Sequence, residues 1–308
     1  MTDAPPGAAR RGPHRAVLPL LILFTVLPAS GSPAGPDGTI VPVPALPDSA
    51  IAPSSLPRTI LNDIGVAFRD ALGFYLAPLS FGPEDRTRTA AGLGAVGVVM
   101  AMDEPLNSLL ISHPDQGFMH EPLEWAQEWG KLRTMQYASV GVYLGGLLAG
   151  KNDIRVTGRL MGEALMLAGA PAITLQYGLG RSRPSSGDGA FKYNFFEWSN
   201  EFQSLPSGHA TVAFAISTVL AKQIDRVWAS VPLYAFAGLT ALSMTWGNEH
   251  WPSDVLIGSA LGYLAGSFVV SEDNKRAAGG MGSGGAEDNF NRFDIGFGAG
   301  GVSLKYHF

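Results

Sequence analysis

The chain has 308 residues, enough for one large helical domain with a full hydrophobic core or for two small ones. Charged residues form 15% of it, against roughly 25% in a typical soluble domain, so its composition lies between those of soluble and polytopic membrane proteins. The net charge of −5, with no long basic run outside the N-terminus, argues against non-specific nucleic-acid binding, and the absence of cysteine excludes disulfides, thiolate nucleophiles and Cys-ligated zinc.

The N-terminus is typical of a secretory signal peptide. Three arginines precede a short apolar run over 16–28, and small residues follow it. Because this run is too short for a comfortable membrane span, we expect a cleaved signal peptide over 1–31, with an uncleaved N-terminal anchor as the alternative. Residues 32–57 are rich in Pro, Gly, Ser and Ala and are predicted to form a linker.

Apolar segments of helical length or spacing make up the centre of the chain, and breaks containing Gly, Pro, Asp or Asn separate them. The segments are 60–75, 90–102, 135–150, 160–177, 210–221, 227–244 and 255–270. Since no alternating strands precede residue 290, they predict an all-α bundle of about six or seven helices, forming one domain over 58–273.

The sequence leaves open whether these helices cross a membrane. Residues 227–244 carry no charge over a length that approaches a span, and 255–270 are also apolar. Glu163 interrupts the segment 160–177, however, and 90–102 is too short to cross. We expect a membrane-associated or partly embedded bundle in the periplasm or cell envelope.

The C-terminal region differs from the bundle. Residues 274–289 are predicted to form a Gly-rich linker. In residues 290–308, apolar and polar side chains alternate on both sides of a glycine-rich break, which predicts a short β-hairpin as an accessory to the helical domain.

A candidate anion site lies at Pro206-Ser207-Gly208-His209, directly before the apolar segment that begins at 210. A helix N-terminus presents unpaired N–H groups and a partial positive charge, so it favours an anion. Ser207 adds a hydroxyl donor, Gly208 allows close approach to the backbone, and His209 lies within reach of a bound anion. An ordinary helix cap with an incidental histidine is the alternative.

A second histidine, His250, also stands just before a predicted helix. Pro252 and Ser253 suit the first turn of that helix, and Asp254 lies four residues after His250. A carboxylate there can hold one ring nitrogen of His250 and leave the other free to attack, as in nucleophilic triads. Taken alone, this stretch is better explained by a capping aspartate and an interfacial histidine.

Arg183 is a candidate phosphate ligand. It precedes Pro184, which disfavours helix at that residue, so its planar guanidinium is expected to project from a helix end, where it suits phosphate oxygens. The alternative is a solvated basic helix end.

In order and spacing, these stretches resemble the signature of the type 2 phosphatidic acid phosphatase family, which shares its fold with vanadium haloperoxidases and bacterial class A acid phosphatases. The matching residues are Arg183-Pro184, Pro206 to His209, Ser243, His250 and Asp254. The resemblance is close over residues 176–254, about a quarter of the chain, and the helical pattern is similar from 60 to 270.

Two positions depart from that signature. Gln176 stands where the family has a lysine, and Met244 stands where it has an arginine. Both family residues are phosphate-binding cations, and loss of one donor aimed at developing charge typically costs about 10²–10³ in rate. Arg181, Lys192 or Arg133 are candidates to replace them in space.

The resemblance implies an exported phosphatase that hydrolyses a phosphate monoester, such as the lipid phosphate phosphatidate, through a phosphohistidine. It implies His250 as nucleophile, His209 as general acid and base, and Asp254 as the group that orients His250. Phosphate binding is assigned to Arg183, Ser207, Gly208 and Gln176. No cofactor and no metal are expected.

Two alternatives follow from the departures and from the shared fold. One is a weakened or inactive envelope protein that keeps the fold, and the other is a vanadate-dependent haloperoxidase, against which the missing cations argue. The expected partner is a phosphorylated small molecule or lipid, with membrane association and without nucleic acid. The oligomeric state is left open.

Overall fold

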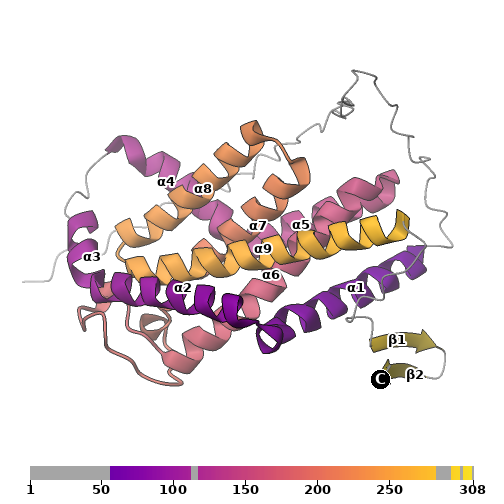
Figure 1. Cartoon of the computed structure of the whole chain (residues 1–308). Coiled ribbons are helices and arrows are strands. Elements are labelled where there is room, and N and C mark those ends of the chain that lie inside the picture. The colour runs from indigo at the N-terminus through magenta and orange to yellow at the C-terminus, as the bar shows by residue number, and fades with distance from the viewer. Residues whose placement is uncertain (1–55, 112–116, 282–292, 299–300, 307–308) are drawn as a thin grey trace, which may run out of the picture. The chain divides into compact units, whose positions relative to one another are not determined.

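The computed structural model describes residues 56–111, 117–281, 293–298 and 301–306, all within the unit formed by residues 48–308. The predicted signal peptide over 1–31 and the linker up to residue 55 lie outside them. The helices of the described residues are α1 (Leu56–Leu76), α2 (Pro83–Ala101), α3 (Asp103–Ile111), α4 (Gly117–Gly130), α5 (Leu132–Ala149), α6 (Asn152–Leu179), α7 (Gly208–Ile224), α8 (Val227–Trp246) and α9 (Pro252–Met281) (Figure 1). Three short 3-10 helices, η2 (Ala77–Ser80), η3 (Pro184–Ser186) and η4 (Asn200–Phe202), lie between them.

The described part of the chain has nine α-helices, so the predicted number of six or seven is too low. The two additional helices are α3 and α4. In α3 the polar Asp103 and Asn107 are buried while Leu109 is exposed, so no apolar stripe marks the helix in the sequence. Pro122 lies inside α4, where the sequence analysis placed no helix.

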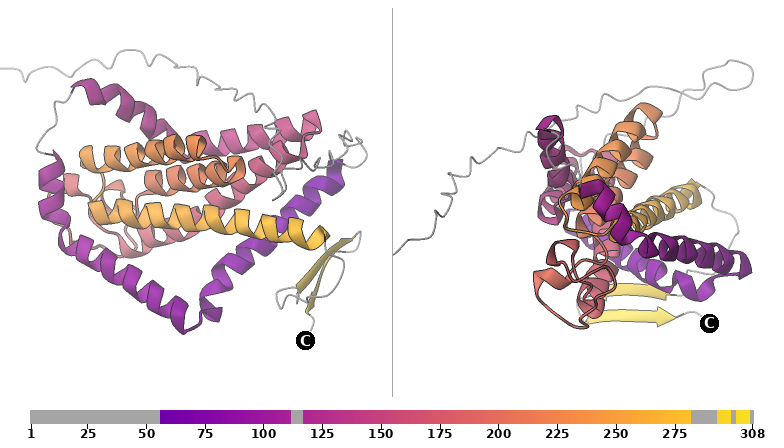
Figure 2. Two further views of the ribbon diagram at one scale, coloured as in Figure 1. Left: turned by 45° about the horizontal axis from the view of Figure 1, so that its top comes forward. Right: turned by 90° about the vertical axis from the view of Figure 1, so that its left-hand side faces the viewer.

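The core lies where α6, α7 and α9 pack together, and these helices run side by side in Figures 1 and 2. Leu160 and Leu167 of α6, Ile216 and Val219 of α7, and Val269 of α9 belong to one cluster of buried apolar side chains. This packing fixes the ends of the three helices relative to one another, which positions the residues described below.

Glycines on α9 allow an unusually close approach to α7. A Cβ atom at Gly262 would lie 2.2 Å from the carbonyl oxygen of Thr211, and one at Gly258 would lie 2.4 Å from that of Ser207. Small residues at such contacts let two helix backbones meet directly. The first turn of α9, which contains Asp254, is therefore held against the first turn of α7.

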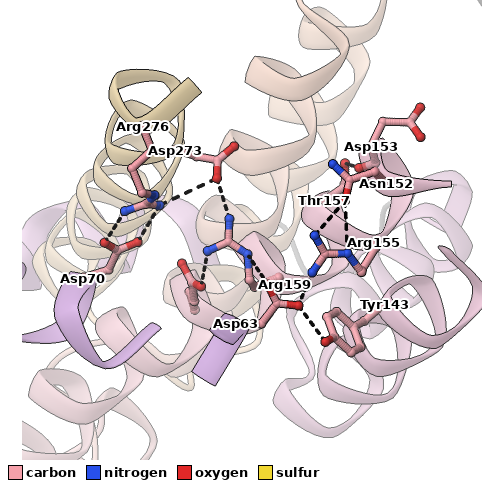
Figure 3. A network of polar contacts seen from close by, with 11 residues as sticks. Asp63, Asp70, Tyr143, Asn152, Asp153, Arg155, Thr157, Arg159, Asp273 and Arg276 are labelled. Carbon is pink, nitrogen blue, oxygen red and sulfur yellow. Dashed lines mark hydrogen bonds and ion pairs between the residues drawn. The ribbon is translucent and has the colours of Figure 1, made fainter. Parts of the chain in front are cut away.

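An ion-pair network joins α1 to α5, α6 and α9 (Figure 3). Asp63 of α1 pairs with Arg155 and accepts a hydrogen bond of 2.7 Å from the Tyr143 hydroxyl. Asp70 of α1 accepts hydrogen bonds of 2.6 and 3.0 Å from Arg276 of α9. Both aspartates are buried, so α1 is attached to the bundle through its charges.

The opposite face of α1 is apolar and exposed, with half of the surface of Leu61, Ile64 and Phe68 accessible. This arrangement is the reverse of a surface helix in water, where apolar side chains are buried and charges face the solvent. It is the arrangement expected where a helix meets lipid, because charges in a membrane face the protein interior and pair there.

Within the part of the chain that the structure describes, two helices are long and apolar enough to cross a membrane, namely α8 and the part of α9 over Pro252–Gly279. Helices α2 and α3 meet the same criterion together, although they are bent by 58° at their junction. Length and composition therefore support the expected association with a membrane.

Helix α9 continues to Met281, past residue 274 where the sequence analysis placed the start of a linker. Within the stretch in which a hairpin was predicted, strands β1 (Phe293–Gly298) and β2 (Gly301–Tyr306) pair antiparallel, with Phe293 opposite Tyr306 and Gly298 opposite Gly301.

Candidate functional site

The first turn of α7 carries three of the predicted site residues. Ser207 is the N-cap, and its hydroxyl oxygen accepts a hydrogen bond of 3.4 Å from the Ala210 amide. Gly208 and His209 are the first two residues of the helix and are half-buried. Their amide groups belong to the unpaired N–H groups of a helix start, which favour a bound anion.

His250 lies in the turn between α8 and α9 and is 3% exposed. Its amide donates to the carbonyl of Met244 (3.2 Å), and its ring Nδ1 lies 2.7 Å from the carbonyl oxygen of Ser204. A carbonyl oxygen can only accept, so Nδ1 carries the proton. In the neutral ring the lone pair is therefore on Nε2, which is the atom available for nucleophilic attack.

The two histidines and Arg183 act on one another electrostatically. Burial, followed by the charge of Arg183, lowers the pKa of His250 to about 3, and His209 contributes to this shift. Burial also lowers the pKa of His209, and Lys131 and Arg183 lower it further. The fold thus brings together His209, His250 and Arg183, which lie far apart in the sequence, and burial favours the neutral form of both rings.

Arg183 is held at the start of η4, and its charge acts on His250. Its Nε donates to the carbonyl of Asn200 (2.7 Å), and Nη2 donates to the Asn200 side chain (3.2 Å). Its Nη1 forms an ion pair with the carboxylate of Glu249, whose side chain is half exposed. Glu249 therefore occupies the fork that the sequence analysis assigned to phosphate.

Asp254 does not hold a ring nitrogen of His250 in the way the sequence analysis expected. Its carboxylate accepts from the Trp251 amide (3.0 Å), from the Ser204 hydroxyl and from Arg181 (2.6 Å). The reason is that Asp254 caps the first turn of α9, while His250 precedes that helix and points to Ser204. Asp254 reaches His250 only through Ser204, which contacts both.

Arg181 cannot replace a missing phosphate ligand, because its side chain is fully buried. Its guanidinium contacts Asp103 (2.7 Å), Asp254 (2.6 Å) and the Ser253 hydroxyl (2.8 Å). Asp103 also accepts from the Ser253 amide (2.9 Å). Arg181 thus joins α3 to the start of α9 underneath the candidate site.

The other proposed replacements, Lys192 and Arg133, are exposed. The lysine that acts on His209 is instead Lys131, at the start of α5, which forms an ion pair with Glu128. A Cβ atom at Gly130 would lie 2.9 Å from the Cβ of His209, so this junction of α4 and α5 runs directly beside the histidine. No motif in the sequence marks Lys131.

Gln176 and Met244 stand at the two positions that depart from the signature. The Gln176 side chain donates to the carbonyl of Pro206 (2.8 Å), and its nitrogen lies 3.6 Å from the position of a Cβ on Gly208. Gln176 therefore supports the loop before α7. Met244 is buried, and its carbonyl holds the amides of Glu249 and His250.

A cavity of about 210 Å³ lies between α5, α6 and α7, next to the first turn of α7. Gln176, Gly208 and His209 form its polar side, and the remaining lining residues are Gly130, Leu132, Leu165, Ala168, Gly169, Ala172, Ile173, Thr211, Val212 and Ala215. The cavity thus offers an apolar space adjoining His209.

Among the described residues, no group of three or more His, Asp or Glu side chains is arranged to hold a metal ion.

Comparison with known proteins finds a family whose model matches part of the chain. The model of the PAP2 superfamily matches residues 158–277, the segment that contains every candidate site residue from Gln176 to Asp254. Over these residues the chain is similar to the PAP2 superfamily. The family resemblance noted in the sequence is therefore confirmed.

The chain is also similar to a lipid A 1-phosphatase of Porphyromonas gingivalis, 26% identical over 261 residues. The match covers 83% of the present chain and 50% of the relative, so the chain spans about half the length of that protein.

Two solved structures resemble the present one. The structure of Aquifex aeolicus LpxE is 19% identical, with a TM-score of 0.44 over 55% of this chain and 95% of the other. A transmembrane PAP2-type phosphatidylglycerolphosphate phosphatase from Bacillus subtilis is also 19% identical, with a TM-score of 0.47 over 60% and 96% of the two chains.

Proposed function

We propose that this PAP2-like protein is a membrane-associated phosphatase that hydrolyses the phosphate monoester of a lipid. The observation that carries the proposal is the environment of His250. Its Nδ1 proton is bound by the Ser204 carbonyl, so Nε2 presents a lone pair beside His209 and Arg183. The similarity to the PAP2 superfamily and to the lipid A 1-phosphatase of P. gingivalis supports a phosphate monoester of a lipid as the substrate.

In the first step, Nε2 of His250 attacks phosphorus and the bond to the leaving oxygen breaks. Protonated His209 gives its proton to that oxygen, so an alcohol departs and a phosphohistidine remains. Arg183 and the N–H groups at the start of α7 stabilise the equatorial oxygens. The Ser204 carbonyl stabilises the ring as it becomes positive, and Asp254 acts as a positioning residue through Ser204.

In the second step, a water molecule attacks the phosphohistidine. His209, now neutral, takes a proton from the water, and the phosphorus–nitrogen bond breaks. Inorganic phosphate leaves, and His250 returns to its neutral form while His209 is again protonated.

We assign to Lys131 part of the positive charge that Gln176 and Met244 do not supply. Lys131 already acts on His209, and an anion between His209 and Arg183 would lie within the field of both cations. The competing interpretation is a protein that keeps the PAP2 fold without its rate. We further propose that the protein is exported, with the site on the outer side of the membrane.

The test is hydrolysis by purified full-length protein in detergent micelles, with release of inorganic phosphate measured from short-chain phosphatidate and from p-nitrophenyl phosphate. His250→Ala should lose activity by about 10⁴-fold or more on both substrates. His209→Ala should lose less on p-nitrophenyl phosphate, because nitrophenolate leaves without a proton. An inactive parent, or an active His250→Ala variant that retains the parent's unfolding midpoint, would refute the proposal.

A further inference from the structure

Four large aromatic side chains project from the segment 191–198, which we call the aromatic loop. Phe191 and Phe195 are 64% exposed, Trp198 is 74% exposed, and Phe196 is 77% exposed. A single exposed apolar residue needs no explanation, but a cluster of this kind marks a surface that binds something. The loop lies between the Arg183 and Ser207 stretches of the candidate site.

The aromatic loop is fixed to the end of α6 by main-chain contacts. The Asn194 amide donates to the Gly180 carbonyl (2.7 Å), and the Ser182 amide donates to the Lys192 carbonyl (2.9 Å). A Cβ atom at Gly180 would lie 1.8 Å from the Asn194 carbonyl oxygen, and Gly180 has a positive φ of 56°, so only glycine suits this position. The exposed aromatics are therefore held in place on a defined surface.

Phe196 adds a second indication that this exposure has a role. Its φ is +60°, in the left-handed region that a bulky residue rarely adopts. Backbone conformations of this kind persist where the surrounding structure enforces them, often at binding sites. The phenyl ring of Phe196 is largely exposed, so the unusual backbone conformation does not serve to bury the ring in the core.

The aromatic loop lies at the end of the two candidate spans. The segment that carries it bonds to the turn between α8 and α9, through the Ser185 amide to the Asn248 carbonyl (3.1 Å) and the Trp251 indole to the Ser182 carbonyl (2.8 Å). If α8 and α9 cross the membrane, this turn marks one membrane surface. Arg183, bound to Asn200, connects the same segment to the candidate site.

We propose that the aromatic loop inserts into the membrane–water interface on the side of the candidate site. Aromatic side chains are favoured at this depth, where their rings reach the acyl region. Lys192 is exposed between Phe191 and Tyr193, and a positive charge in the inserted loop favours anionic headgroups. Insertion places the candidate site at the level of lipid phosphates. The expectation that insertion increases hydrolysis of lipid substrates rests on the proposed function.

The location of the loop can be tested without enzyme activity. The chain has no cysteine, so Phe196→Cys or Phe195→Cys provides one attachment point for a nitroxide label. The full-length protein is reconstituted into phosphatidylcholine–phosphatidylglycerol vesicles. Spin relaxation is then measured with oxygen, which concentrates in lipid, and with a water-soluble nickel complex. Ser185→Cys, at an exposed polar position of the same segment, is the matched control.

Labels at 195 and 196 should be relaxed more by oxygen than by nickel, and the label at 185 more by nickel. If labels at all three positions are relaxed more by nickel than by oxygen, the proposal is wrong. This readout is independent of catalysis, so an enzymatically inactive protein would refute the proposed function and leave the inference about the loop intact.

Hydrolysis gives a second measurement. The triple variant Phe195→Ser, Phe196→Ser and Trp198→Ser should lose at least about tenfold of its activity on phosphatidate in vesicles while activity on p-nitrophenyl phosphate stays within about twofold. Trp228→Ser, an exposed tryptophan at the start of α8, should affect neither substrate. Equal losses on both substrates in the triple variant would overturn the role in docking.

Discussion

Arg181 and Arg183 lie two residues apart, and their substitution should have different consequences. Arg181 is fully buried between Asp103 and Asp254. Arg181→Gln leaves these two buried carboxylates without a counter-ion. Removing one partner of a buried pair typically costs about 3–5 kcal/mol of folding free energy, because the remaining charge stays out of water.

Arg183→Gln should affect hydrolysis more than folding stability. The side chain of Arg183 is 14% exposed, but its ionic partner Glu249 is half exposed and can be solvated by water. The variant should lose about 1 kcal/mol of stability or less. If Arg183 stabilises the transition state, hydrolysis should fall by about 10²–10³, the usual effect of removing one donor aimed at developing charge.

The assay compares thermal unfolding of the two purified variants in one detergent, with kcat for p-nitrophenyl phosphate measured where both are folded. Arg181→Gln should lower the midpoint by roughly 6 °C or more, and Arg183→Gln by roughly 4 °C or less. The reasoning is wrong if Arg181→Gln has the same unfolding midpoint as the parent and yet loses hydrolysis, because Arg181 would then bind the phosphate.

Three further predictions concern the candidate site. Glu249→Gln frees Arg183 from its carboxylate, so KM for p-nitrophenyl phosphate should fall by up to about fivefold, and a higher KM would contradict this. For phosphatidate, kcat/KM should fall as pH rises through the pKa of His209, which lies below its ordinary 6.5, because the general acid then loses its proton. Lys131→Met should move this fall to higher pH, because the charge of Lys131 lowers the pKa of His209. Gln176→Lys should raise kcat/KM by about tenfold or more in the same assay, and an unchanged rate would show that the missing cation is not limiting.

The rate gain of Gln176→Lys and the pH dependence each have a control. Thr174→Lys adds the same charge on an exposed position of α6, two residues before Gln176, and should not raise the rate. His209→Ala should remove the alkaline fall seen with phosphatidate, so a fall that persists in that variant belongs to the substrate. His250 has a pKa of about 3 and stays neutral, so it adds no acid limb above roughly pH 4.

The residues of the candidate site could be found in the sequence where a helix start marks them. Proline and small polar residues precede α7 and form the first turn of α9, and they identify the neighbourhoods of His209 and His250. Arg183 could be found because it stands before Pro184, although α6 already ends at Leu179. These residues could be found because the residue types that begin a helix are also the ones that surround the candidate site.

Other contacts could not be predicted, because they depend on the packing of distant segments. Ser204 acts through its main-chain carbonyl, which every residue possesses, and only the fold places it at His250. Lys131 reaches His209 because α4 ends beside α7. Asp254 was expected to contact His250 from its spacing alone, but capping of α9 directs its carboxylate to the Trp251 amide.

The position of the charges also explains how a chain with few charged residues holds its helices together. In lipid, burial of apolar surface does not drive helices to associate, so close packing, hydrogen bonds and ion pairs must do so. Two sets of pairs serve this purpose: Asp63 and Asp70 join α1 to the bundle, and Arg181 joins α3 to α9 through Asp103. The second set also fixes Asp254, and through Ser204 it fixes His250. The same buried charges that assemble the helices therefore orient the proposed nucleophile. Substitution of Arg181 should for this reason lower folding stability, and it should lower the rate of hydrolysis only as a consequence.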